Sequence, residues 1–141
     1  MGVCDSKFHQ CIYFASQALA RKVEKLAIAC WQPVGLSPSH AYLLMLVLEN
    51  PGIQPMEICQ QLQLTPSTIT RLTEKLESRG LVNRHYEGKE THLQPTAMAL
   101  DLQPMMQQCM AGFMEQYGAL RAKVPGNTLV QDICKFADLI T

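Results

Sequence analysis

A helix with a hydroxyl-rich start lies directly before a short stretch of β pattern, and this order limits the folds open to the 141-residue chain. The segment "TPSTITRLTEKLESRGL", residues 65–81, begins with a threonine cap and a proline, and a glycine follows its helical part. Two β-capable runs, "LVNRHY" and "THLQ", follow on either side of Glu87-Gly88-Lys89-Glu90, a connection of hairpin length. The rest of the chain has helical spacing, so we predict one hairpin in a mainly α fold.

Apolar spacing and breaker residues define the predicted helices. We expect helices over residues 8–31, 41–48, 55–62 and 66–79, another after Pro95 and Thr96, and a last one from about Asn127. Pro104 should kink or interrupt the helix after the hairpin. A short helix, the three-residue turn "QLT", a second helix and a hairpin form the order of a winged helix-turn-helix.

Composition excludes several classes of protein. With 48% apolar residues, 141 residues suffice for one domain with a sizeable core. Twelve basic and twelve acidic residues cancel, so a polyanion must be bound by a local patch. The longest apolar run, residues 41–48, is too short for a membrane span, and no export signal is visible. We therefore expect a cytoplasmic protein with reduced cysteines, no membrane association, no metal and no cofactor.

The helix over residues 66–79 has two unlike sides. Ile69, Leu72 and Leu76 share one side and are expected to pack on the preceding helices. The opposite side carries short hydroxyls and cations, which suit the first turns of a recognition helix in a major groove. The predicted DNA-binding residues of this helix are Ser67, Thr68, Thr70, Arg71 and Lys75. Arg71 is the candidate for guanine and Lys75 for phosphate, whereas the alternative interpretation is a capped, solvated helix.

The stretch "LTPSTITRLTEKLESRGLVNRHYEGKETHLQPT" resembles the helix-turn-helix and wing of MarR-type transcriptional regulators, and "GLSPSHAYLLMLVLENPGIQPMEICQQL" resembles the part before it. The resemblance implies a single chain over 1–141, with a winged helix-turn-helix DNA-binding lobe over 36–95. It also implies N- and C-terminal dimerisation helices over 1–32 and 96–141. A homodimer of this kind binds a palindromic operator in double-stranded DNA and is released by a small molecule or an oxidant.

The tip of the predicted wing is shorter than is usual in that family. The family's wing carries an Asp-x-Arg element in a longer loop, which this chain lacks at Glu87-Gly88-Lys89-Glu90. This difference leaves Lys89 and Arg84 to touch phosphates. Thr96 lies where the family has a threonine that opens the helix after the wing.

Two hypotheses for signal sensing remain open at this stage. Some members of the family sense peroxides through a cysteine in the first helix, where Cys11 lies comparably, with Tyr13 nearby and Tyr42 facing it. Alternatively, a small aromatic or amphipathic effector lies between the dimer helices and the DNA-binding lobe, lined by Trp31, Tyr42 and methionines of the fifth helix.

Two other classes of function compete with DNA binding. One is a winged-helix module that contacts protein instead of DNA, for which the zero net charge is favourable. Salt dependence of duplex affinity separates the two, because phosphate contacts release counterions. An enzyme ranks third, since no catalytic triad, paired carboxylates, phosphate loop or zinc motif stands out.

Overall fold

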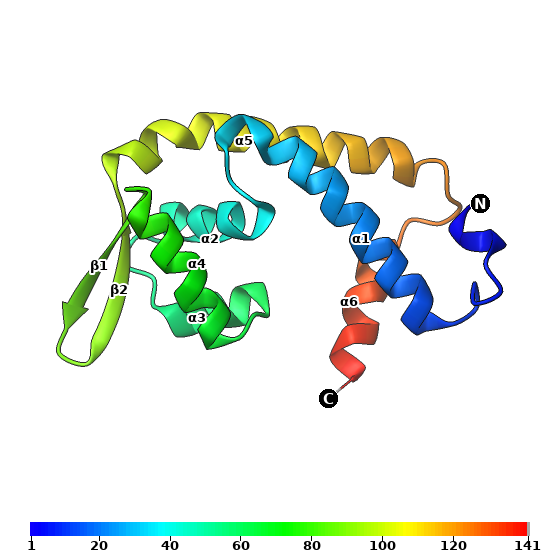
Figure 1. The fold of residues 1–141 in the computed structure, drawn as a ribbon, viewed down its shortest axis with the longest axis horizontal. Helices are drawn as coiled ribbons and strands as arrows, with labels where there is room; N and C mark the ends of the chain where they lie inside the picture. The colour runs from blue at the N-terminus through cyan, green and yellow to red at the C-terminus, as the bar shows by residue number, and fades with distance from the viewer. Residues whose placement is uncertain (141) are drawn as a thin grey trace.

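A computed structural model describes residues 1–140, in which a winged-helix lobe lies at one end and long helices extend from it toward both termini (Figure 1). The helices are α1 (Ile12–Trp31), α2 (Pro38–Glu49), α3 (Pro55–Leu62), α4 (Pro66–Ser78), α5 (Ala97–Arg121) and α6 (Leu129–Leu139), with 3-10 turns at Val3–Asp5 and Gln32–Val34. The strands are β1 (Val82–Glu87) and β2 (Glu90–Pro95). The mainly α winged-helix fold is thus confirmed.

Local capping chemistry sets the ends of α4. The Thr65 hydroxyl accepts a hydrogen bond from the backbone N–H of Thr68 at 3.4 Å, and Pro66 occupies the first helical position. Gly80, which follows the end of α4, has a φ of +74°, a left-handed conformation that glycine adopts without strain. These predictions of cap and terminator are confirmed, as are the bounds of α3.

The core of the lobe lies where α2, α3, α4 and the hairpin meet. Ile69, Leu72 and Leu76 of α4 are buried, as predicted, and α4 packs against both α2 and α3. Leu93 of β2 is also fully buried in this cluster. Burial of each such side chain contributes about 1.5–3 kcal/mol. The outer side of α4 is thereby held at the surface.

The hairpin is longer, and its turn shorter, than we predicted. The strands pair in antiparallel register from Val82 opposite Pro95 to Glu87 opposite Glu90, so the turn is two residues, Gly88 and Lys89, instead of four. Gly88, with a φ of +62°, allows this tight turn. A bridge between Ile53 and Leu93 attaches the hairpin to the loop before α3.

Two predicted helix starts were wrong. The first helix begins at Ile12 instead of residue 8, because a separate turn precedes it and Cys11 occupies its N-cap. The second begins at Pro38, three residues before the predicted start, and this proline occupies the first turn behind the Ser37 cap. The last helix, expected from about Asn127, begins at Leu129.

Pro104 does not interrupt α5, which continues from Ala97 to Arg121. Proline removes one N–H donor and therefore leaves one backbone carbonyl of the preceding turn, that of Leu100, without its helical bond. Both Pro104 and Leu100 are exposed, so water can solvate that carbonyl. Thr96 caps the start of α5, with its hydroxyl accepting from the N–H of Ala99 at 3.2 Å and donating to the Gly80 carbonyl at 2.6 Å.

Apolar side chains on α1 and α6 are exposed in the single chain. Each residue of α6 is exposed, including Leu129, Val130, Ile133, Phe136 and Leu139. On α1, the apolar residues at helical spacing are also largely at the surface, with Ile12, Leu19 and Val23 exposed. Within residues 1–140, no helix has the length and apolar character needed to cross a membrane.

Candidate nucleic-acid interface

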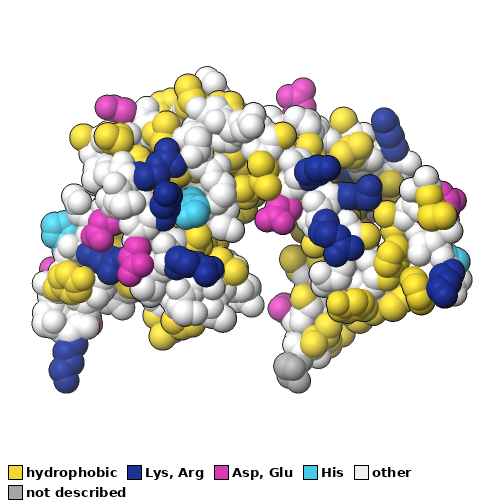
Figure 2. Space-filling view, in the orientation of Figure 1, with side chains coloured by type: hydrophobic (Ala, Val, Ile, Leu, Met, Phe, Trp, Pro, Cys, Tyr) yellow, Lys and Arg dark blue, Asp and Glu magenta, His cyan; other side chains and the backbone are white. Residues whose placement is uncertain are grey.

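The outer surface of α4 has a basic edge and an acidic edge. Arg71, Lys75 and Arg79 follow one another at four-residue steps and therefore form a row along the helix. Glu74 and Glu77 lie on the other edge, toward the hairpin. Figure 2 shows Lys and Arg side chains gathered over α4, with acidic side chains between them and the hairpin.

The first turn of α4 presents hydroxyl groups beside this basic row. Thr65 Oγ1 lies 3.0 Å from Thr68 Oγ1 and 3.3 Å from Ser67 Oγ, so the three hydroxyls form one hydrogen-bonded group. Ser67, Thr70 and Arg71 are exposed, and Thr68 is half-buried. The structure thus brings the five residues that the sequence assigned on α4 to its outer surface.

Arg84 of β1 faces the acidic edge of α4. Its Nε lies 3.7 Å from a Glu77 oxygen and its Nη2 4.0 Å from a Glu74 oxygen, and its side chain is only 21% exposed. Arg84 therefore neutralises carboxylates beside the proposed interface, whereas the sequence suggested that it touches phosphate. The two glutamates were not expected as its partners, because their proximity depends on how the hairpin folds onto α4.

The tip and the middle of the wing differ in their contacts. Lys89 is exposed at the two-residue turn. In the middle of β2, His92 Nδ1 lies 2.8 Å from the Gly52 carbonyl oxygen and Nε2 lies 3.2 Å from a Glu90 carboxylate oxygen. Both ring nitrogens thus face acceptors. The hydrogen bond to Gly52 most strongly raises the pKa of His92 above 6.5, desolvation opposes it, and Glu90 and Glu87 raise it further.

The three residues that we predicted for signal sensing do not lie together. Trp31 is fully buried and packs edge-on against Tyr42, with ring centroids 6.2 Å apart. Cys11 is exposed at the N-terminal end of α1, whereas Trp31 ends that helix. The 20 residues of α1 span roughly 30 Å, so Tyr42 does not face Cys11 of the same chain, and that part of the prediction was wrong.

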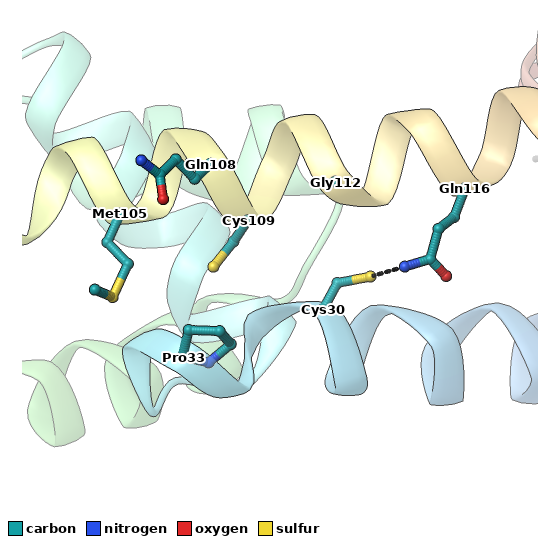
Figure 3. Close-up of a pocket in the computed structure, with 7 residues that line it drawn as sticks. All are labelled: Cys30, Pro33, Met105, Gln108, Cys109, Gly112 and Gln116. Atoms are coloured by element: carbon teal, nitrogen blue, oxygen red, sulfur yellow. Dashed lines mark hydrogen bonds between the residues drawn. The ribbon is translucent and has the colours of Figure 1, made fainter.

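A pocket of about 260 Å³ lies instead between α5 and the end of α1 (Figure 3). Its lining is formed by Cys30, Pro33, Met105, Gln108, Cys109, Gly112 and Gln116. The volume approaches the lower end of the range for small-molecule sites. Of the residues that the sequence suggested for an effector site, a methionine of α5 is present and Trp31 and Tyr42 are not.

Two cysteines face this pocket from different helices. Gln116 Nε2 lies 3.5 Å from Cys30 Sγ. Burial raises the pKa of the Cys109 thiol, the nearby Cys30 raises it further, and a hydrogen bond with the backbone of Val34 partly opposes both effects. The Cys109 thiol is therefore held in its neutral form. No group of three His, Cys, Asp or Glu side chains within residues 1–140 is placed to hold a metal ion.

Comparison with known proteins agrees with this architecture. A sequence model of the MarR family matches residues 34–89, which include α2, α3, α4, β1 and the turn of the hairpin. The HTH-type transcriptional repressor MdtR of Bacillus subtilis (strain 168) is 23% identical over 79 residues. That alignment covers 56% of this chain and 51% of the repressor, so the chain spans about half the length of that relative.

Solved structures match over a larger part of the chain. CouR from Rhodococcus jostii RHA1 bound to p-coumaroyl-CoA has a TM-score of 0.72 and 20% identity, covering 99% of this chain and 94% of CouR. The S. aureus MepR-DNA complex gives a TM-score of 0.72 and 15% identity, covering 90% and 93%. The winged-helix lobe thus matches the sequence model of the MarR family, and the chain shares the winged helix-turn-helix fold of these solved structures over nearly its whole length.

Proposed function

We propose that this protein is a homodimeric transcriptional regulator that binds a palindromic operator in double-stranded DNA. The observation that carries the proposal is the surface of α4, where the exposed Ser67 and the row Arg71, Lys75 and Arg79 share one edge while Arg84 neutralises the acidic edge. The chain has zero net charge, so this separation supplies the local positive patch that DNA binding requires.

Each part of the interface has a distinct role in this proposal. Ser67, Thr68 and Thr70 approach the floor and walls of the major groove, where short hydroxyls bond base edges or phosphates. Arg71 reads guanine with its forked guanidinium. Lys75 on α4 and Lys89 at the wing tip each bind a backbone phosphate. The complex of S. aureus MepR with DNA supports this class of ligand for the fold.

The homodimer follows from the exposed apolar surfaces of α1 and α6. A single chain leaves Leu19 and Val23 of α1 and Ile133 and Phe136 of α6 exposed, and contiguous apolar surface of this kind marks an interface. A two-fold axis through these helices sets the recognition helices about 34 Å apart, one turn of duplex.

The signal that releases the DNA is, in this proposal, a small molecule in the pocket beside Gly112. The pocket lies between α5 and the end of α1, near the junction of the winged-helix lobe and the long helices, so a ligand there can change the angle between them. CouR, of the same fold, is described with p-coumaroyl-CoA bound. Oxidation of Cys11, which is exposed, is the second candidate signal.

Titration of duplex DNA at several salt concentrations tests the proposal. A regulator that neutralises several phosphates loses affinity steeply as salt rises, with a logarithmic slope of about −0.9 per phosphate. Selection from random duplexes should then enrich a palindrome. A protein-interaction module would show weak, unselective binding, and this outcome would replace the proposal with the alternative.

A further inference from the structure

A histidine at the start of α2 faces the C-terminal half of α4. His40 Nδ1 lies 2.6 Å from the hydroxyl oxygen of Ser37, the N-cap of α2. Arg79 is fixed beside them, because its Nη1 donates a hydrogen bond to the Gly35 carbonyl at 2.6 Å. Lys75 lies one turn earlier on α4. Figure 2 shows a histidine next to Lys and Arg side chains over this part of α4.

The groups that act on His40 all oppose its protonation. Burial lowers the pKa of His40 below 6.5, and the Lys75 ammonium and the Arg79 guanidinium lower it further. Those two cations are the charges that α4 presents to His40, and the group contributed by its own helix is the uncharged Ser37. The carboxylates of α4 are turned toward Arg84, on the opposite edge.

The cluster is therefore a concentration of positive charge at the surface of the lobe. The N–H groups in the first turn of the 12-residue α2 add to the positive potential there. The cluster continues the row that begins at Arg71, so an anion bound here lies on the same surface as the proposed recognition residues. When this surface lies on a duplex, a phosphate of the DNA backbone is such an anion.

We propose that Ser37, His40, Lys75 and Arg79 form a site for one backbone phosphate of duplex DNA, and that His40 takes up a proton when the phosphate binds. The inference rests on the proposed DNA-binding function and adds three residues that the sequence did not suggest. Because Ser37 holds Nδ1, Nε2 is the nitrogen that reaches the phosphate, and Lys75 and Arg79 bind the same anion.

Proton uptake follows from the change in charge around the ring. In the free protein, two cations disfavour the imidazolium, so His40 is neutral near pH 7. A bound phosphate offsets those cations and favours the imidazolium. Protonation and DNA binding then promote each other. Affinity for DNA rises as pH falls through the pKa of the DNA-bound state, and it levels off below the lower pKa of the free state.

The test compares the pH dependence of duplex affinity in wild type and His40→Gln, measured by fluorescence anisotropy at constant ionic strength from about pH 8 to about pH 5.5. Wild-type affinity should rise about three- to tenfold more than that of His40→Gln over this range. His9→Gln, which removes an exposed histidine near the N-terminus, should retain the full rise.

Salt dependence supplies a second measurement. Lys75→Gln should reduce the logarithmic salt slope by about one per protomer, or about two for the dimer, whereas Lys22→Gln on α1 should leave it unchanged. If wild type binds DNA but His40→Gln shows the same pH profile, the proton-linked site is excluded while the proposed function stands. If wild type does not bind duplexes at all, the proposed function fails and the inference fails with it.

Discussion

The Nε of Arg84 on β1 lies 3.7 Å from a carboxylate oxygen of Glu77 on α4. This pair, with Glu74 at 4.0 Å on the same guanidinium, joins the wing to the helix that carries the proposed recognition residues. It also removes negative charge from the edge of a surface that is otherwise basic. In the proposed interface, Arg84 therefore acts through the two glutamates and has no phosphate contact of its own.

Arg84→Met should lower duplex affinity about three- to thirtyfold at about 0.1 M salt, because it leaves two uncompensated carboxylates beside the DNA. Methionine was chosen because it retains much of the apolar part of the arginine side chain. Adding Glu74→Gln and Glu77→Gln to Arg84→Met should restore most of the affinity. If the triple variant stays as weak as the single one, Arg84 contacts phosphate directly. Anisotropy titrations of the three proteins decide between these accounts.

Arg71→Ala should weaken binding to the selected operator by about 1–3 kcal/mol and relax the base preference at one position of each half-site. Lys89→Ala, at the exposed wing tip, should instead weaken all sequences alike and flatten the salt dependence. The measurement is competition between operator and random duplexes. Unchanged operator affinity in Arg71→Ala would show that the recognition surface of α4 is misassigned.

The sequence predicts the elements that local chemistry determines. Thr65, Pro66 and Gly80 specify the ends of α4 through a cap, a fixed φ and a left-handed residue, and the structure has all three. In contrast, the predicted start of the second helix was too late, because proline can either stop one helix or start another, and only the Ser37 cap distinguishes the two roles of Pro38.

Contacts between distant segments could not be predicted in this way. The bridge from Ile53 to Leu93 and the pairing of Arg84 with Glu77 depend on how the hairpin packs, which neither periodicity nor spacing determines. The supposed proximity of Cys11 and Tyr42 failed for the same reason, since α1 separates them by its full length. The apolar side of α4 was predictable from its own spacing, whereas these particular contacts between distant segments were not.

Phe136→Asp and Ile133→Asp should each convert the proposed dimer to monomer, because a charge would replace an apolar side chain whose burial is worth about 1.5–3 kcal/mol. Met56→Asp on α3 is the control, since Met56 is an exposed apolar residue of the winged-helix lobe. Light scattering at micromolar concentration should give twice the chain mass for wild type and for Met56→Asp. A monomeric wild type would contradict the dimer.

His92 should stabilise the fold at acidic pH and lose this effect as pH rises. Its pKa is raised in the folded state, so the stabilisation is complete below its ordinary value of 6.5 and disappears as pH rises through the higher folded value. His92→Gln should therefore lower the melting temperature near about pH 5.5 more than near about pH 8. Chemical shifts of the His92 ring protons, followed during a pH titration, report the pKa directly. A larger loss of stability at the alkaline pH would contradict this assignment.

Gly112→Leu should abolish ligand binding in the pocket between α5 and α1 while leaving DNA binding intact. A Cβ at Gly112 would meet no atom within 4 Å among residues 1–140, so a leucine can occupy the empty space. Gly118→Leu is the matched control, because Gly118 lies on the same helix, has equally open surroundings and does not line the pocket. Both changes should raise helix stability alike, by up to about 1 kcal/mol.

The measurement is a thermal-shift screen of small apolar and aromatic compounds, followed by release of the duplex. A compound at 100 times its dissociation constant should stabilise wild type and Gly118→Leu by about 2.7 kcal/mol and Gly112→Leu by much less. The same compound should release DNA from wild type and Gly118→Leu but not from Gly112→Leu. A parallel series with an organic hydroperoxide tests oxidation of Cys11 as the signal. If hydroperoxide releases DNA from wild type and from Gly112→Leu but not from Cys11→Ser, oxidation of Cys11 replaces the pocket ligand as the signal.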